Sequence, residues 1–361
     1  MSRSRRADER GMALALAIFA LVVVGALVAG AFLAGHLEQR TGRSSLYAEQ
    51  AADAAEAGAA ELLASWDAPT LNVLAPGSVA AFPATPLAGR ASYRSTVTRL
   101  NEQLFLVQSH GTRVDASGGT LARRTVGLVA RLASLGEGPE AALTTGRPVE
   151  IAGSEVTISG NDSASVAGSD CAPGRSRPAT RAVPPSSVVF AMFGDVEFER
   201  LAAHAAIVLP DTTLTSSLRP SLDDRNHCDI ADGANWGEPR ASSGAALESC
   251  RRYFPIVYAK GPRLTIAAGG RGQGILLVAG GLDITSDFDF SGLIVVKGGV
   301  RISGAGSRIT GALMAANGPD QSRTQIAGDA TVQYSSCALR SALGGAAFAE
   351  PLGQRSWVQV Y

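Results

Sequence analysis

Histidine, aromatic side chains and net charge are scarce in this sequence. The formal net charge is zero, so no global field attracts the chain to nucleic acid. Only four histidines occur and no cysteines form a CxxC pair, so no recognisable zinc-ligand spacing is present. The chain also lacks GxSxG, HExxH and a phosphate-binding glycine loop followed by lysine. We therefore expect no enzyme activity, no metal, no cofactor and no nucleic-acid partner.

Apolar residues and glycine are abundant instead. Of the 361 residues, 46% are hydrophobic and 41 are glycine, while aromatic residues make up only 6%. A chain of this length can bury a large core, and two or more domains are expected. The bias toward glycine favours many short strands joined by tight turns.

A long apolar run follows the charged N-terminus. Residues 12–35 read MALALAIFALVVVGALVAGAFLAG, with no charged side chain. A helix of that length reaches about 36 Å, and the hydrocarbon core of a bilayer is about 30 Å thick. The residues before it carry four arginines, which places the N-terminus in the cytoplasm by the positive-inside rule. We expect one transmembrane helix, with everything after His36 outside.

Three interpretations of this segment compete. It could be a plain signal anchor. It could be a secretory signal peptide cut near Ala29-Gly30-Ala31, although the apolar part of such peptides is typically only about 7–15 residues long. In the third, residues 1–11 are a charged leader ending in glycine, which is removed on the cytoplasmic side so that the span remains in the product.

The helical pattern continues beyond the apolar run. Residues 36–67 are rich in alanine and glutamate, which favour helices, and Pro69 is expected to stop the helix. Small or apolar residues recur at three- and four-residue steps, which gives one narrow stripe. The stripe consists of Leu37, Thr41, Ser44, Ala48, Ala51, Ala55, Gly58, Leu62 and Trp66.

These features resemble a known family. The sequence Arg10-Gly11, followed by Met12 and the apolar run, looks like the leader of type IV prepilins. The stretch AEQAADAAEAGAAELL looks like the segment that follows the membrane span in the PilX-like minor pilins. The resemblance implies cleavage between Gly11 and Met12 by a prepilin peptidase, and methylation of the new N-terminus. It also implies contact with inner-membrane lipid and other pilins through the helix, with a periplasmic C-terminal domain that reaches the cell surface after assembly.

Position five after the proposed cut departs from the major pilins. They have glutamate there, whose carboxylate neutralises the N-terminal ammonium of a neighbouring subunit inside the apolar filament core, where an unpaired charge is costly. This chain has Leu16 at that position. A minor or terminal subunit fits this substitution better than a repeating one.

The rest of the chain predicts two β regions, 68–145 and 146–361. In the first, residues 71–90 are expected to form a loop, and strands are expected over 91–100, 102–113 and 122–132. The pilin resemblance implies that they form an antiparallel sheet packed on the helix. In the second, the proline-rich segment 171–187 is expected to be a linker or surface loop.

An internal repeat lies within residues 263–335. GILLVAGGLDIT from Gly274 matches GLIVVKGGVRIS from Gly292, and GALMAANG from Gly311 repeats its first half. Apolar strands separated by glycine turns at this period favour a β-helix or solenoid, in which each coil buries its face on the next. The alternative is an antiparallel roll with hairpins at Gly280-Gly281 and Gly298-Gly299. The fold expected overall is α+β and membrane-anchored.

The four cysteines all lie in the second half of the chain, and an even number outside the reducing cytosol favours disulfides. Cys228 and Cys250 flank a loop-like segment, so we favour that pair, with Cys171 and Cys337 as the other. Three connectivities remain open from sequence.

Two acidic clusters are the candidates for catalysis or calcium binding. One contains Asp283, Asp287 and Asp289, and the other Asp223, Asp224 and His227. Aspartates beside glycine and serine more commonly cap turns and face water. We therefore favour a minor pilin or pilus-assembly protein over two alternatives. These are a bitopic anchor displaying a β-helical adhesin or carbohydrate-binding module, and a carbohydrate-active enzyme.

Overall fold

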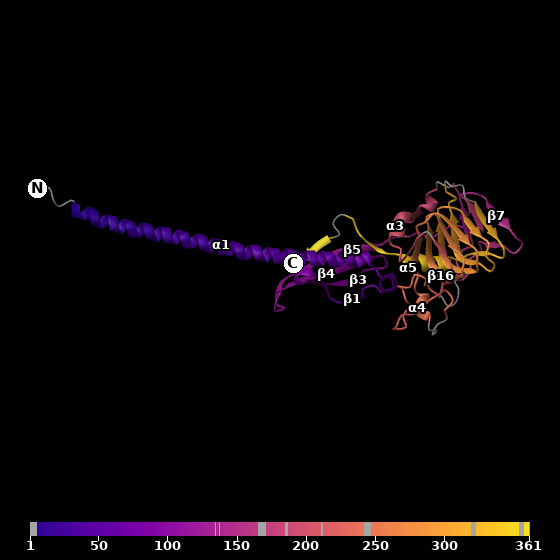
Figure 1. Ribbon diagram of the computed structural model, residues 1–361, viewed down its shortest axis with the longest axis horizontal. Coiled ribbons are helices and arrows are strands. Elements are labelled where there is room, and N and C mark those ends of the chain that lie inside the picture. Colours follow the sequence, from indigo (N-terminus) through magenta and orange to yellow (C-terminus); the bar gives the residue numbers. More distant parts are fainter. Residues whose placement is uncertain are drawn as a thin grey trace.

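The computed structural model has one protruding helix and a β-rich head (Figure 1). It describes residues 6–133, 135–136, 138–164, 171–184, 187–210, 212–241, 247–318, 323–353 and 357–360. Helix α1 (Arg6–Ala64) contains 59 residues. It ends slightly before the predicted residue 67, and a separate short helix, α2 (Ala68–Leu71), begins there with a proline in its first turn. Proline is tolerated in that turn but not in a helix interior, which explains the break.

An antiparallel sheet packs on the second half of α1. Its three long strands, β3 (Ala91–Arg99), β4 (Leu104–Val114) and β5 (Thr120–Leu132), lie where the sequence predicts them. The expected loop over 71–90 was wrong in part, because β1 (Val79–Ala81) and β2 (Thr85–Leu87) both pair with β3. Their pairing with a long neighbour outweighs the local glycine and proline signals.

Two sheets of parallel strands form the distal part of the head, which we call the stack. One sheet has the order β12-β14-β16-β18-β20-β22-β8, with β6 on β20 and β9 on β6, and the other has the order β13-β15-β17-β19-β21-β7. From β12 to β21 the chain alternates between the sheets. The strands of the first sheet are β12 (Ile207–Leu209), β14 (Ile256–Ala259), β16 (Gly270–Val278), β18 (Phe288–Val296), β20 (Arg308–Ala315), β22 (Thr331–Tyr334), β8 (Thr157–Ser159), β6 (Leu143–Thr145) and β9 (Thr180–Ala182). Those of the second are β13 (Thr212–Leu214), β15 (Arg263–Ile266), β17 (Gly281–Ile284), β19 (Val300–Ile302), β21 (Thr324–Ala327) and β7 (Val149–Ala152).

The repeated glycines lie in register across the first sheet. Gly274 pairs with Gly292, which pairs with Gly311, and all three have positive φ angles. A Cβ at Gly292 would collide with the carbonyl of Gly274, and one at Gly311 with the carbonyl of Gly292. Only glycine fits such a column. The alternative of an antiparallel roll was wrong, because β16 and β17 belong to different sheets and pair in parallel with β18 and β19, the strands of the following repeat.

The two sheets bury different numbers of faces. Residues 275–278 and 293–296 are all buried, because one face of the first sheet lies inside the stack and helix α5 (Ser336–Ala346) packs on the other. In β19, by contrast, Arg301 is exposed between buried Val300 and Ile302. This difference explains why the first strand of each repeat is continuously apolar and the second alternates.

The chain passes twice between the sheet on α1 and the stack. β6 pairs with β20, although it lies within the region predicted to belong to the pilin-like sheet. Near the C-terminus, β23 (Ala349–Pro351) and β24 (Trp357–Val360) pair with β5 and so extend the sheet on α1. The division at residue 146 stays a prediction.

Two disulfides join the segments that surround the stack. They are Cys228–Cys250 and Cys171–Cys337, the connectivity that the sequence favours. The remaining short elements lie in the connections: η1 (Ala88–Arg90), η2 (Val188–Phe190), β10 (Met192–Phe193), β11 (Val196–Glu197), α3 (Phe198–Ala203) and α4 (Glu248–Arg251).

Candidate functional site

No other part of the described chain covers residues 13–46 of α1. Residues 13–46 are exposed throughout, and the helix extends away from the head (Figure 1). α1 is apolar and long enough to cross a bilayer, and its most apolar window has a mean hydropathy of 2.8. An exposed apolar surface of this extent needs lipid or protein to cover it. The large side chains on it include Leu14, Leu16, Ile18, Phe19, Leu21, Leu27, Phe32 and Leu33.

The predicted leader junction lies at the start of this helix. The backbone of α1 runs through Gly11 and Met12, but the side chain of Met12 and all of residues 1–5 lie outside the described part of the chain. Cleavage after Gly11 therefore stays a prediction. Leu16 is 66% exposed, so its side chain is available to a neighbouring helix or to lipid.

The second half of α1 packs on the antiparallel sheet through small residues. Ala51, Ala55 and Ala59 are fully buried, and Leu62 is nearly so. On the sheet, a Cβ added to Gly111 would collide with the backbone carbonyl of Ala51. Ala51 is thus the first buried member of the predicted stripe; Ala48 before it is half-buried, and the earlier members Leu37, Thr41 and Ser44 are exposed.

Polar contacts fix the helix on the sheet. Arg113 donates from Nε to Oε1 of Gln50 over 2.7 Å, and Ser95 Oγ donates to the carbonyl of Gly58 over 3.2 Å. Tyr93 donates its hydroxyl to the Glu61 carboxylate, and this hydrogen bond, with burial, raises the pKa of Tyr93. Each bond joins α1 to a strand, so the helix has one defined position on the sheet.

Asn72 connects the end of this helix to the stack. Trp66 packs edge-on against Phe105 at 5.1 Å and donates from Nε1 to Asn72 Oδ1 over 2.8 Å. Asn72 in turn donates from Nδ2 to the carbonyls of Ala347, at 2.8 Å, and Gly344, at 3.0 Å. Sequence reasoning missed this residue, since a single asparagine after a helix gives no signal of so distant a partner.

The acidic clusters are not brought together as metal sites. Asp283 accepts both its bonds from Arg263 at 2.9 Å, and Asp289 lies 2.6 Å from Arg240. Asp223 Oδ1 caps a turn by accepting from the backbone N–H groups of His227 and Arg225, which lowers the pKa of Asp223. Within the described ranges, no group of three or more histidines, cysteines or carboxylates could hold a metal ion.

No family model matches the sequence, and no curated protein is significantly similar to it. Among solved structures, the competence-associated pilin ComZ from Thermus thermophilus is similar to this chain at 13% sequence identity. The alignment covers 87% of this chain and 97% of ComZ, with a TM-score of 0.24. At that TM-score the likeness supports no conclusion about this chain.

Proposed function

We propose that this chain is a pilin-type subunit, a minor pilin or pilus-assembly protein whose helix α1 packs with the helices of other pilins in a filament. One observation carries the proposal. The first half of α1 is apolar and uncovered, while its second half is docked on an antiparallel sheet through buried small residues. Such a helix suits storage in a membrane before assembly and burial among other helices afterwards.

The proposal includes a processing step and a location. A prepilin peptidase removes residues 1–11, so that Met12 becomes the first residue. Before assembly, α1 spans the inner membrane with its N-terminus in the cytoplasm and the head in the periplasm. Support comes from the arginines before the span and from the apolar run that follows Gly11 directly.

A role at low copy number or at the filament end follows from Leu16. A repeating subunit needs a carboxylate to neutralise the buried N-terminal ammonium of its neighbour, and leucine provides none. We further infer that the stack is a short β-helix, whose in-register glycines allow the coils to approach closely. We assign no catalytic role to the acidic residues. The carboxylates of Asp283 and Asp289 pair with arginines, and that of Asp223 accepts hydrogen bonds from backbone N–H groups.

The mature N-terminus tests the proposal. We expect the protein recovered from cells that contain a prepilin peptidase to begin at Met12, measured by mass spectrometry of the intact chain. Gly11→Leu should leave the leader in place, because the peptidase requires the small residue. Gly30→Leu is the matched control and should be processed normally. A wild-type chain that retains residues 1–11 contradicts the proposal and favours a bitopic anchor.

A further inference from the structure

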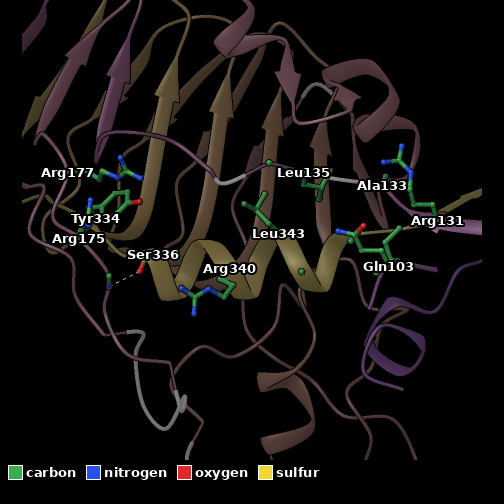
Figure 2. A pocket seen from close by; sticks show the side chains of 15 residues that line it. Gln103, Arg131, Ala133, Leu135, Arg175, Arg177, Tyr334, Ser336, Arg340 and Leu343 are labelled. Carbon is green, nitrogen blue, oxygen red and sulfur yellow. Dashed lines mark hydrogen bonds between the residues drawn. The ribbon is translucent and has the colours of Figure 1, made fainter. Parts of the chain in front are cut away.

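A groove lies beside helix α5, on the side that faces the segment from Gly174 to Arg177 (Figure 2). Its volume is about 640 Å³, which is within the range of ligand-binding pockets. The lining extends from Ser336 at the first turn of α5 to Ala347 just beyond its last turn. A helix of that length is about 16 Å long, so the groove suits an elongated ligand.

Arginines lie at both ends of the groove. Arg175 and Arg177 lie near Tyr334 at one end, Arg340 projects from α5, and Arg131 lies at the other end (Figure 2). Arg131 pairs with Asp195 at 2.9 Å. The other three are exposed, have no ion-pair partner in the described part of the chain, and face no carboxylate among the described lining residues. The groove is therefore cationic at the Arg175 end.

The backbone that carries these arginines is held in place. The disulfide Cys171–Cys337 ties their segment to the first turn of α5, and Arg177 N donates to the carbonyl of Gly160 over 2.8 Å. Asp162 accepts from the backbone N and Oγ of Ser336 at 2.8 and 2.6 Å and also from the backbone N of Gly174, so its carboxylate joins this segment to the start of α5. Because this backbone is fixed, less conformational entropy is lost when a ligand binds to the arginines.

The middle of the groove is apolar. Leu135 and Leu343 lie between the Arg175 end of the groove and Arg131 in Figure 2. A uniform polyanion would place charge over these leucines as well as over the arginines. The ring of Tyr334 is only 3% exposed, so the groove offers little aromatic surface on which nucleic-acid bases could stack. A chain with acidic residues at one end and apolar residues beyond them matches the lining better.

We propose that this groove binds an extended acidic peptide segment of a partner protein. Arginine clusters recognise such segments because the guanidinium group donates two parallel hydrogen bonds to a carboxylate. Arg175 and Arg177 bind carboxylates at one end of the segment, and the leucines contact the apolar residues that follow them. The proposal concerns the head alone and does not depend on a filament role.

The test measures binding of a labelled peptide to the full-length protein in detergent micelles with both disulfides intact. The peptide has about seven residues, enough to span the groove in extended form, with glutamates at one end and apolar residues beyond them. We expect the double variant Arg175→Ala/Arg177→Ala to weaken binding at least about tenfold, since hydrogen bonds to charged groups are the strong ones. Arg340→Ala should weaken it in the same direction.

Two controls make the outcome decisive. Arg123→Ala changes an exposed arginine on β5 outside the groove, and it should bind the peptide as the wild type does. A peptide with serines in its centre should bind more weakly than the apolar one. The proposal is overturned if the double variant binds as tightly as the wild type. It is also overturned if the serine peptide binds equally well, or if an oligonucleotide or a polyuronate binds more tightly than the peptide.

Discussion

Gly111 on β4 lies directly against the backbone of Ala51 on α1, where a Cβ would collide with the Ala51 carbonyl and the Ala55 amide nitrogen. We expect Gly111→Ala to lower the free energy of unfolding of the head by about 3 kcal/mol, since neither backbone can move without separating helix and sheet. Thermal unfolding followed by circular dichroism measures the effect. Gly344→Ala is the control, because its added Cβ would meet nothing within 4 Å apart from the neighbouring backbone of its own helix. Equal midpoints for the two variants would contradict the close packing.

The glycine column of the stack gives a second prediction. Gly292 has a φ of 140°, and a Cβ there would collide with the Gly274 carbonyl of the preceding coil. Gly292→Ala should therefore cost about 3 kcal/mol through strain and loss of coil register. Gly281→Ala is the matched change, since its Cβ would meet its nearest neighbours at 3.5 Å, an ordinary contact. Chemical denaturation compares the two, and a cost at Gly292 no larger than at Gly281 would refute the column's role.

The two disulfides should differ in their contribution to stability. Cys228–Cys250 closes 22 residues and Cys171–Cys337 closes 166. In the chain-entropy account, their loss costs about 3 and about 5 kcal/mol respectively. We expect the Cys171→Ser/Cys337→Ser variant to unfold at a lower denaturant concentration than Cys228→Ser/Cys250→Ser. The reverse order would mean that local packing, rather than loop length, sets the contribution.

Local patterns predict the strands whose partners are close in sequence or in repeat period. The repeat correctly predicts the continuous apolar runs after Gly274 and Gly292 and the alternating strands that follow them. These patterns are informative because a strand buried on both faces is apolar throughout, whereas a strand buried on one face alternates. β6 and β23 could not be predicted. Each has three residues, and its pairing with β20 or β5 depends on distant segments that leave no periodic trace.

Only part of the candidate functional site could likewise be predicted from the sequence. The exposed half of α1 follows from its composition, because a charge-free apolar run of that length can be covered only by lipid or protein. The end of the buried stripe at Ala51 does not follow, since Leu37 and Thr41 continue the same spacing without a sheet to cover them. The role of Asn72 could not be predicted either, because its partners are the backbone carbonyl groups of Gly344 and Ala347, which are distant in the sequence.

Leu16 gives a prediction about assembly. Introducing a carboxylate by Leu16→Glu supplies the partner for the N-terminal ammonium of a neighbouring subunit, and a buried charge gains most from such a pair. We expect a larger share of the protein in sheared filaments, measured by immunoblotting against the membrane fraction. Phe19→Glu is the control, because it places the same charge elsewhere on the exposed half of α1 and should reduce incorporation. An unchanged or smaller filament share for Leu16→Glu would contradict the role assigned to this position.

Tyr253 predicts how stability changes in alkali. Burial, aided by the nearby charge of Asp229, raises the pKa of Tyr253 to about 12, while the unfolded chain keeps an ordinary value near 10. Because the folded pKa is the higher one, this stability is fully present below pH 10 and is lost as pH rises through 12. The loss should be on the order of 2–3 kcal/mol. The Tyr253 hydroxyl has no hydrogen-bond partner among the described residues, so Tyr253→Phe should be neutral or stabilising at pH 7. Denaturation at pH 8 and pH 11.5 should show a smaller decline for Tyr253→Phe than for the wild type, and equal declines would show that this hydroxyl does not govern the alkaline limit.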